Sequence, residues 1–328
     1  MRAMAVAVLA LVFAAVLTLT VGVREGGFSL VWQALSAFDP NDPAHIAIQS
    51  VRMPRLIAGL IAGAALGMAG TIMQAITRNP LADPGILGIN AGAAFAVVIG
   101  SLIAGRADNG LMAALAFPGA AAAAVAVFAL GGGLKGDAGP VRLTLAGVAL
   151  SAMLLSFVSA IILARNEALE VFRFWVTGSL AQAGMRPLGY MAIAAVLGAG
   201  LAIAIAPRME ALSLGSALAR GLGTNPGRIQ FGALVAVTAL TGAAVGVAGP
   251  IAFLGLLVPR LARRVGGHVL RRELIAAAIL GAAILLFADT IGRILIPPVE
   301  IRVGTMTALI GAPIFIWMAR RLRAGAGA

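Results

Sequence analysis

The sequence predicts an all-α, polytopic membrane protein that crosses the bilayer about ten times. Three observations indicate this fold class. Of the 328 residues 61% are hydrophobic, 42 are glycine, and only 11% are charged, whereas soluble domains carry about 25% charged residues. One crossing takes about 20 apolar residues, so ten crossings use roughly 200 positions and leave the others for loops. We therefore expect a single transmembrane domain over residues 1–328 and no large soluble domain.

Apolar runs along the chain set the expected spans. They lie near residues 4–22, 54–77, 86–104, 111–133, 143–164, 188–206, 229–248, 250–264, 274–292 and 304–319. The eighth run is the weakest, because Gly249 and Pro250 begin it and Pro259 lies inside it, and proline disfavours a continuous helix. The segment 165–187 is too polar to cross but holds three aromatic residues, so an interfacial or half-inserted helix is expected there.

The first run follows Arg2 and has the positive start and apolar stretch of a secretory signal peptide. A retained helix is favoured, because Thr18, Thr20, Gly22 and Val23 provide no small-x-small cleavage site next to the run. The first run is therefore counted as a span.

Charge sets the expected orientation. If the N-terminus lies inside, ten alternating spans place 15 basic and 4 acidic residues on the cytoplasmic side, a net charge of +11, and 9 basic and 8 acidic residues outside, a net charge of +1. Cytoplasmic loops of membrane proteins carry the excess of Lys and Arg. We therefore expect both termini in the cytoplasm. Nucleic-acid binding is disfavoured, because no basic run is interleaved with aromatic residues.

The chain lacks the residue patterns of an enzyme or a metal site. It has no cysteine, His45 and His268 fall in predicted loops on opposite sides, and no carboxylate lies near the middle of a predicted span. Carriers coupled to protons or sodium keep ionisable or polar ligands near the midplane. We expect no catalytic residue, no metal and no cofactor, and infer that a partner supplies the energy. A stand-alone secondary transporter of a small solute is the alternative.

Arg52-Met-Pro-Arg55 stands at the predicted outer mouth of the second span. Two arginines at a helix N-terminus oppose the helix dipole, so an external partner is expected to compensate them, and snorkelling to lipid headgroups is the alternative. Asp289 and Arg293, four residues apart near the outer end of the ninth span, are expected to pair.

Two further segments are predicted on the cytoplasmic side. The turn Arg78-Asn-Pro-Leu-Ala-Asp-Pro-Gly85 is stiff, since each proline restricts the residue before it. It is either a plain connector or a constriction of a transport pathway. The segment 207–228 has apolar helical spacing at i, i+3, i+4 and i+7 from Leu214. This short face either contacts a protein partner or lies on the membrane surface.

Several segments in the same order resemble the ABC importer permeases that carry iron-siderophores, haem and vitamin B12. The resemblance runs through most of the chain. It rests on Arg52-Met-Pro-Arg55, Gln74–Gly88, Leu145–Leu150, Leu212–Gly215 with Ala219 and Leu222-Gly223, Gly249–Pro259, Ala288–Arg293 and Gly311–Phe315. The fold that it implies is that of the vitamin B12 importer permeases, with ten spans.

The resemblance implies a homodimer with the pathway at its interface, two cytoplasmic ATP-binding subunits and an external substrate-binding protein, periplasmic or lipid-anchored. The membrane is then a bacterial cytoplasmic (inner) membrane, and the cargo is a ferric chelate, foremost an iron-siderophore, with haem or cobalamin as alternatives. The implied site residues are Arg52, Arg55 and Arg293 for binding-protein docking, Asn79 and Leu81 for the cytoplasmic gate, and Leu212, Gly215, Leu218, Ala219, Leu222 and Gly223 for ATPase coupling.

Two positions depart from the family's pattern. Arg260 follows Pro259 where the family commonly has histidine, which puts any role of that histidine in doubt. Glu300-Ile-Arg-Val-Gly304 stands where the family often has Glu-x-Pro-x-Gly, and Arg302 adds an outer cation within reach of a binding protein.

Overall fold

The computed structural model describes residues 2–22, 27–104, 109–133, 140–213, 215–221 and 223–325. Within these ranges the chain is helical, and its one β-bridge joins Ile296 to Val299. The helices are α1 Arg2–Thr20, α2 Phe28–Ser36, α3 Pro43–Ala47, α4 Met53–Thr77, α5 Ile89–Ala104, α6 Asn109–Leu130, α7 Pro140–Ala164, α8 Asn166–Trp175, α9 Leu188–Ser213, α10 Ser216–Gly221, α11 Pro226–Ala248, α12 Leu254–Gly266, α13 Leu270–Ile294 and α14 Val303–Gly325. A π-helical turn, η1 Ile48–Arg52, and two 3-10 turns, η2 Pro84–Leu87 and η4 Ala183–Met185, complete the set.

Seven helical stretches of the described residues are long and apolar enough to cross a membrane. They are Arg2–Thr20, Pro43–Thr77, Gly110–Leu130, Val141–Ala164, Leu188–Leu212, Pro226–Ala248 and Leu270–Ile294, and Ile89–Ala104 and Val303–Ile316 are shorter apolar helices. The expected eighth span corresponds to α12, which has only 13 residues. At 1.5 Å per residue α12 is about 20 Å long, less than the roughly 30 Å hydrocarbon core. The count of ten spans stays a prediction.

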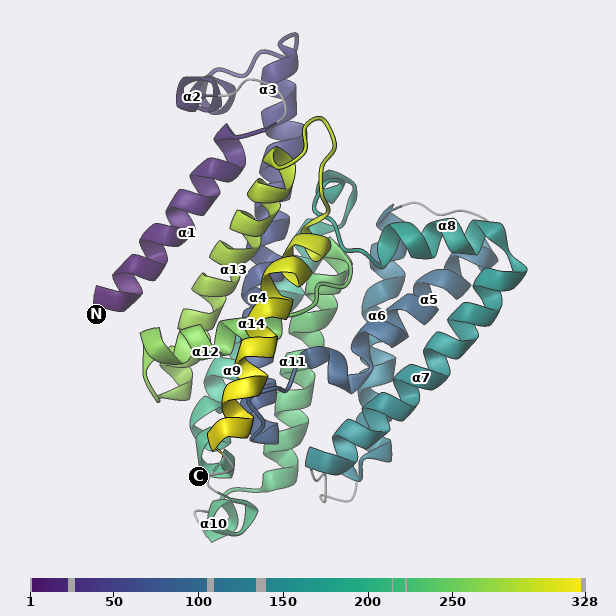
Figure 1. Ribbon diagram of the computed structural model, residues 1–328, viewed down its shortest axis with the longest axis vertical. Coiled ribbons are helices and arrows are strands. Elements are labelled where there is room, and N and C mark those ends of the chain that lie inside the picture. The colour runs from purple at the N-terminus through teal and green to yellow at the C-terminus, as the bar shows by residue number, and fades with distance from the viewer. Residues whose placement is uncertain are drawn as a thin grey trace.

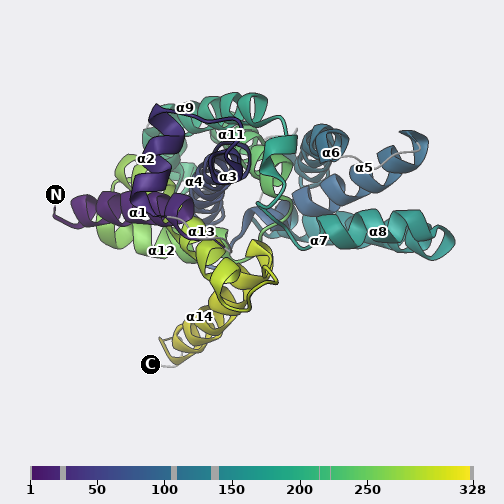
Figure 2. The same cartoon turned by 90° about the horizontal axis from the view of Figure 1, so that it is seen from above.

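Two groups of helices make up the molecule. Figure 1 shows α4, α9, α11, α12 and α13 as one bundle, with α1 along one flank, and α5, α6 and α7 as a second group beside α11. In the view from above, α14 projects away from both groups (Figure 2). α8 lies across the ends of α5 and α7 rather than along them (Figure 1), and its 10 residues are too few to cross the bilayer.

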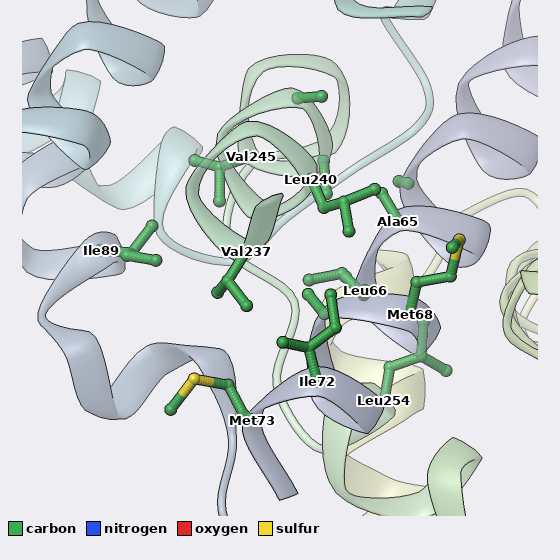
Figure 3. Close-up of a cluster of buried hydrophobic side chains, with 14 of the residues drawn as sticks. Ala65, Leu66, Met68, Ile72, Met73, Ile89, Val237, Leu240, Val245 and Leu254 are labelled. Atoms are coloured by element: carbon green, nitrogen blue, oxygen red, sulfur yellow. The ribbon is translucent and has the colours of Figure 1, made fainter. Parts of the chain in front are cut away.

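The core lies where α4 meets α11 and α13. The buried share of the apolar window is 78% in the stretch that contains α4, 72% in α11 and 61% in α13, but only 17% in each of α1, α7 and α9. The faces of α1, α7 and α9 are therefore available for contact with lipid or with another chain. Figure 3 shows part of this core, in which Leu66, Ile72, Val237 and Leu240 point toward one another from α4 and α11.

Glycine lets α4 approach α13 closely. A Cβ atom on Gly63 would lie 2.5 Å from the carbonyl oxygen of Gly281, and one on Gly67 would lie 2.3 Å from that of Ala277. In lipid, such close backbone contact supplies much of the attraction between helices. The glycine stripe of the second predicted span is therefore a packing surface.

We expect Gly63→Ala to destabilise the folded protein by about 1–3 kcal/mol, because the added methyl group forces two helix backbones apart. Thermal unfolding of the purified protein in detergent measures the change. Gly200→Ala in α9 is the matched control, since a Cβ atom there meets nothing within 4 Å. Equal melting temperatures for the two variants would contradict the packing role of Gly63.

The two ends of the bundle carry the segments that the sequence assigns to opposite sides. α2 and α3 lie at one end, called the α2 end, together with the last turn of α13 (Figure 1). α10 and the C-terminal end of α4 lie at the other, called the α10 end. This arrangement separates the three expected docking arginines from the expected gate and coupling residues by the length of the bundle.

Candidate functional site

The arginines expected to face a partner at the α2 end are all buried. Arg52, Arg55 and Arg293 are 8, 4 and 3% exposed. The second predicted span was expected to begin near Arg52, but α3, η1 and α4 follow one another without a break from Pro43 to Thr77. The helix is instead capped by Asp42, whose carboxylate accepts a hydrogen bond from the amide of Ala44.

This continuity removes the electrostatic conflict expected at Arg52 and Arg55. The two residues lie in the third and fourth turns of a continuous helix rather than at its N-terminus, where the dipole acts most strongly. Acceptors within the chain compensate both charges, so the helix dipole no longer argues for an external partner. Docking by these residues stays a prediction.

Arg55 is held by two carboxylates. Its Nε donates to Oδ2 of Asp289 at 2.7 Å and its Nη2 to Oδ1 at 2.9 Å, a bidentate pair, while Nη1 donates to Oε2 of Glu300 at 2.7 Å. Asp289 is fully buried, and the side chain of Glu300 is 35% exposed. Nε of Arg293 lies 3.4 Å from Oδ2 of Asp289, which confirms the expected pair. α4, α13 and the loop after α13 thus meet in one buried ion cluster.

Arg52 and Arg293 cap the C-terminal end of α1 by donating hydrogen bonds to its last carbonyl groups. Nη1 of Arg293 donates to the carbonyl oxygens of Thr18 and Val21 at 3.2 and 2.7 Å. Nη1 of Arg52 donates to that of Leu19 at 2.7 Å and, more weakly, to that of Thr20 at 3.4 Å. The last carbonyl groups of a helix have no partner within the helix, and cations are favourable at this end of its dipole. The two arginines therefore fasten α1 to α4 and α13.

A cavity of about 650 Å³ lies beside this cluster, at the α2 end. We call it the charged cavity, and its polar lining includes Arg55, Glu167, Glu170, Arg186, Glu300 and Arg302. Arg302 donates to Oγ1 of Thr177 and, at 3.3 Å, to the carbonyl oxygen of Arg173. No local pattern in the sequence marks Arg186 or the two glutamates of α8, because they share the cavity with Arg55 and Glu300, which are distant in sequence.

The expected gate residues lie in a compact turn at the α10 end. Asn79 is exposed and Leu81 half-buried. Oδ1 of Asn79 accepts from the amide of Leu81 at 2.9 Å. Arg78 has a left-handed backbone, with φ 53°, and its Nη2 donates to the carbonyl oxygen of Leu212 at 2.6 Å. The turn is thereby tied to the start of the expected coupling segment.

Asp83 caps η2 in this turn. Its Oδ1 accepts from the amide of Gly85 at 2.8 Å. Burial raises the pKa of Asp83 to about 6 from its ordinary 3.8, and the hydrogen bond from Gly85 only partly opposes the shift. The ionised form is therefore disfavoured in the folded protein.

We expect Asp83 to make the protein more stable at pH 5 than at pH 7. The folded state binds the proton more tightly than the unfolded state, so this contribution is complete below about pH 4 and is lost as pH rises through about 6. Between pH 7 and pH 5 it amounts to about 1 kcal/mol. Asp83→Asn keeps the acceptor for Gly85 and should remove that part of the pH profile of thermal unfolding. Asp39→Asn, in an exposed turn, controls for the lost charge, and an unchanged profile in Asp83→Asn would refute the assignment.

The expected coupling segment forms a short helix, α10, at the far end of the bundle (Figure 1). Leu212 and Ala219 are buried, and Oγ1 of Thr224 donates to the carbonyl oxygen of Ala219 at 2.6 Å. Gly215 and Gly223 have positive φ, 127° and 74°, and bound α10 on either side. Leu222, and Leu214 of the predicted apolar face, lie outside the described residues, as does the side chain of Leu218. Of the described coupling residues, Leu212 and Ala219 therefore pack inward.

The fold and the two ends define a class of protein: an α-helical membrane protein with a buried ion cluster at one end and a short exposed helix at the other. The chain belongs to the FecCD transport family, whose model matches residues 10–321. This confirms the resemblance drawn from the sequence.

Individual relatives agree with the family. The chain is 41% identical to the ferric enterobactin transport system permease protein FepD of Escherichia coli. The 317 aligned residues cover 97% of this chain and 94% of the relative. It is 38% identical to the iron(3+)-hydroxamate import system permease protein FhuB of Bacillus subtilis, over 95% of this chain and 81% of the relative. A solved structure of a metal-chelate-type ABC transporter in an inward-facing conformation is similar with a TM-score of 0.82 and 26% identity, over 97% of this chain and 98% of the other.

Proposed function

We propose that this protein is the membrane-spanning permease subunit of an ATP-binding-cassette importer for a ferric chelate. The observation that carries the proposal is the similarity over nearly the whole chain to permeases named for ferric enterobactin, iron(3+)-hydroxamate and ferric citrate transport. An iron-siderophore is the foremost cargo. Haem and cobalamin, which the resemblance also allowed, are not named in these relatives.

The partners of this permease are, in our proposal, a second copy of itself, two cytoplasmic ATP-binding subunits and an external binding protein. The exposed apolar surface of α7 is an argument for the dimer: only 17% of its apolar window is buried, and Leu145, Val148 and Phe157 are exposed. α10 supports the coupling role, because it projects from the end of the bundle (Figure 1). ATP hydrolysis belongs to the separate subunits.

Docking of the binding protein by Arg52, Arg55 and Arg293 stays a prediction. The carbonyl contacts of Arg52 and Arg293 favour a role in holding α1. Arg55, by contrast, lines the charged cavity, and its Nη1 donates a hydrogen bond to the partly exposed Glu300. We therefore place the external contact on Arg55.

The gate at Asn79 and Leu81 is likewise a proposal. The turn that holds them packs against the end of α9 through Arg78. A movement of α10 would reach this turn through the same short segment, since Leu212 precedes α10 by four residues. We propose that ATP-driven movement at α10 opens the turn.

Reconstitution tests the function directly. Proteoliposomes that contain the permease, its ATP-binding subunit and its binding protein should take up ferric chelate only when ATP is present. The alternative, a stand-alone secondary transporter, predicts uptake by the permease alone in an ion gradient. Uptake of the second kind, without the ATP-binding subunit, would overturn the proposal.

The orientation can be tested with single cysteines, because the chain has none of its own. We propose a bacterial cytoplasmic membrane with both termini inside, which places Asn41 outside and Arg220 inside. In intact spheroplasts a membrane-impermeant maleimide should label Asn41→Cys and leave Arg220→Cys unlabelled until the cells are lysed. The reverse pattern would invert the topology.

A further inference from the structure

Arg186 differs from the other arginines that are buried at the α2 end or line the charged cavity. Arg52, Arg55 and Arg293 each donate to oxygens of the chain, and Arg302 donates to Thr177. In the described part of the chain the guanidinium of Arg186 has no hydrogen-bond or ion-pair partner, although the residue is half-buried. It lines the charged cavity.

The energetics of this position favour an anion from outside the chain. Burial lowers the pKa of Arg186 to about 10 from its ordinary 12.5, and no carboxylate offsets the burial. A pKa of about 10 leaves the guanidinium charged at neutral pH. Burying a charge without a partner is costly, whereas a guanidinium paired with a carboxylate forms charge-assisted hydrogen bonds.

The backbone around Arg186 is well held. Its amide donates to the carbonyl oxygen of Ala183 at 3.1 Å, and its own carbonyl oxygen accepts from the amide of Leu188 at 2.8 Å. η4 packs on the helix that carries Arg55, where a Cβ atom on Gly184 would lie 3.0 Å from the carbonyl oxygen of Ser50. The backbone of Arg186 is therefore fixed before any ligand arrives, so only the side chain has to be ordered on binding.

The cavity also limits the class of ligand. Its volume of about 650 Å³ is in the range of small-molecule sites. Glu167 and Glu170 line it as well, so a ligand that is anionic on every side would be repelled. A molecule with a carboxylate at one end and hydroxyl or other donor groups elsewhere satisfies both kinds of lining.

We propose that the charged cavity is a carboxylate-binding site in which Arg186 receives the anionic group. The carboxylate belongs to a small molecule, because the cavity has the volume of a small-molecule site. This inference goes beyond the proposed function, and its test needs no ATP-binding subunit. Its failure would therefore leave the importer assignment intact.

Trp175 provides the readout, since it lines the same cavity and is 6% exposed. The full chain, with Trp32 and Trp317 replaced by Phe, is placed in lipid nanodiscs. It is titrated with gluconate, which carries one carboxylate at one end and hydroxyl groups along the rest of the molecule. We expect a saturable change in fluorescence, weakened about tenfold or more by Arg186→Gln and partly restored by Arg186→Lys. Glycerol at the same concentrations should give no such change.

Arg165→Gln is the matched control, because Arg165 is exposed at the same end and is not among the lining residues. Unfolding temperatures of all variants are compared to show that each is folded. Affinity for the binding protein is measured as well. If gluconate has no effect on Trp175 but Arg186→Gln lowers that affinity tenfold, Arg186 serves partner docking and the proposal is overturned. Equal gluconate titrations of wild type and Arg186→Gln, or an equal loss in Arg165→Gln, also overturn it.

Discussion

Replacing Asp289 by alanine is expected to destabilise the protein by about 3–5 kcal/mol, because removing one partner of a buried ion pair leaves an uncompensated charge. Asp289 is fully buried and is the shared partner of Arg55 and Arg293. Its loss therefore removes the one buried carboxylate that Arg55 of α4 and Arg293 of α13 share.

The measurement is thermal or denaturant unfolding of the purified protein in detergent. Glu300→Ala is the control, since the side chain of Glu300 is 35% exposed and solvent screens its pair with Arg55. It should cost well under half as much. The double variant Arg55→Met with Asp289→Met should recover part of the lost stability, because an apolar pair removes the charges together. A stable Asp289→Ala protein would show that the cluster is not a structural tie.

Replacing Leu218 by glutamate in α10 is expected to lower ATP-driven uptake at least tenfold while the basal ATP hydrolysis of the assembled complex persists. The proposal gives α10 an apolar contact with the ATP-binding subunit, and a charge buried in such a contact without a partner is costly. A few buried apolar residues carry most of the binding energy of an interface. The loss should therefore appear as uncoupling rather than as unfolding.

Val269→Glu is the matched control for this experiment. Val269 is 47% exposed and precedes the first turn of α13, near the α10 end and outside α10. The same change of side chain there should leave uptake near the wild-type rate. Wild-type uptake by Leu218→Glu, or an equal loss in Val269→Glu, would remove the coupling role from α10.

Much of the fold was accessible from the pattern of residues. Nine of the ten expected apolar runs coincide with α1, α4, α5, α6, α7, α9, α11, α13 and α14, because a run of apolar residues in a membrane leaves the backbone no alternative to a helix. The short helix near Leu218 and the pair between Asp289 and Arg293 were also expected correctly, since both depend on residues within one or two helical turns.

The errors came from interactions between distant segments. The second span was expected to begin near Arg52, because the apolar run begins there, whereas the helix starts at Pro43, directly after its N-cap Asp42. The pairing of Arg55 with Asp289, 234 positions away in sequence, was not expected either. No local periodicity reports a contact of that separation.

Composition and short-range spacing were thus sufficient for the class of protein and for the separation of two sets of loops, because the cost of unsatisfied backbone groups in lipid acts on each segment independently. The states of individual charges depended on packing. Whether Arg55 is paired, whether Arg52 closes a neighbouring helix and whether Arg186 is left without a partner follow from which helices lie together. These questions are decided by burial and by distances between segments, and neither is a property of any one segment.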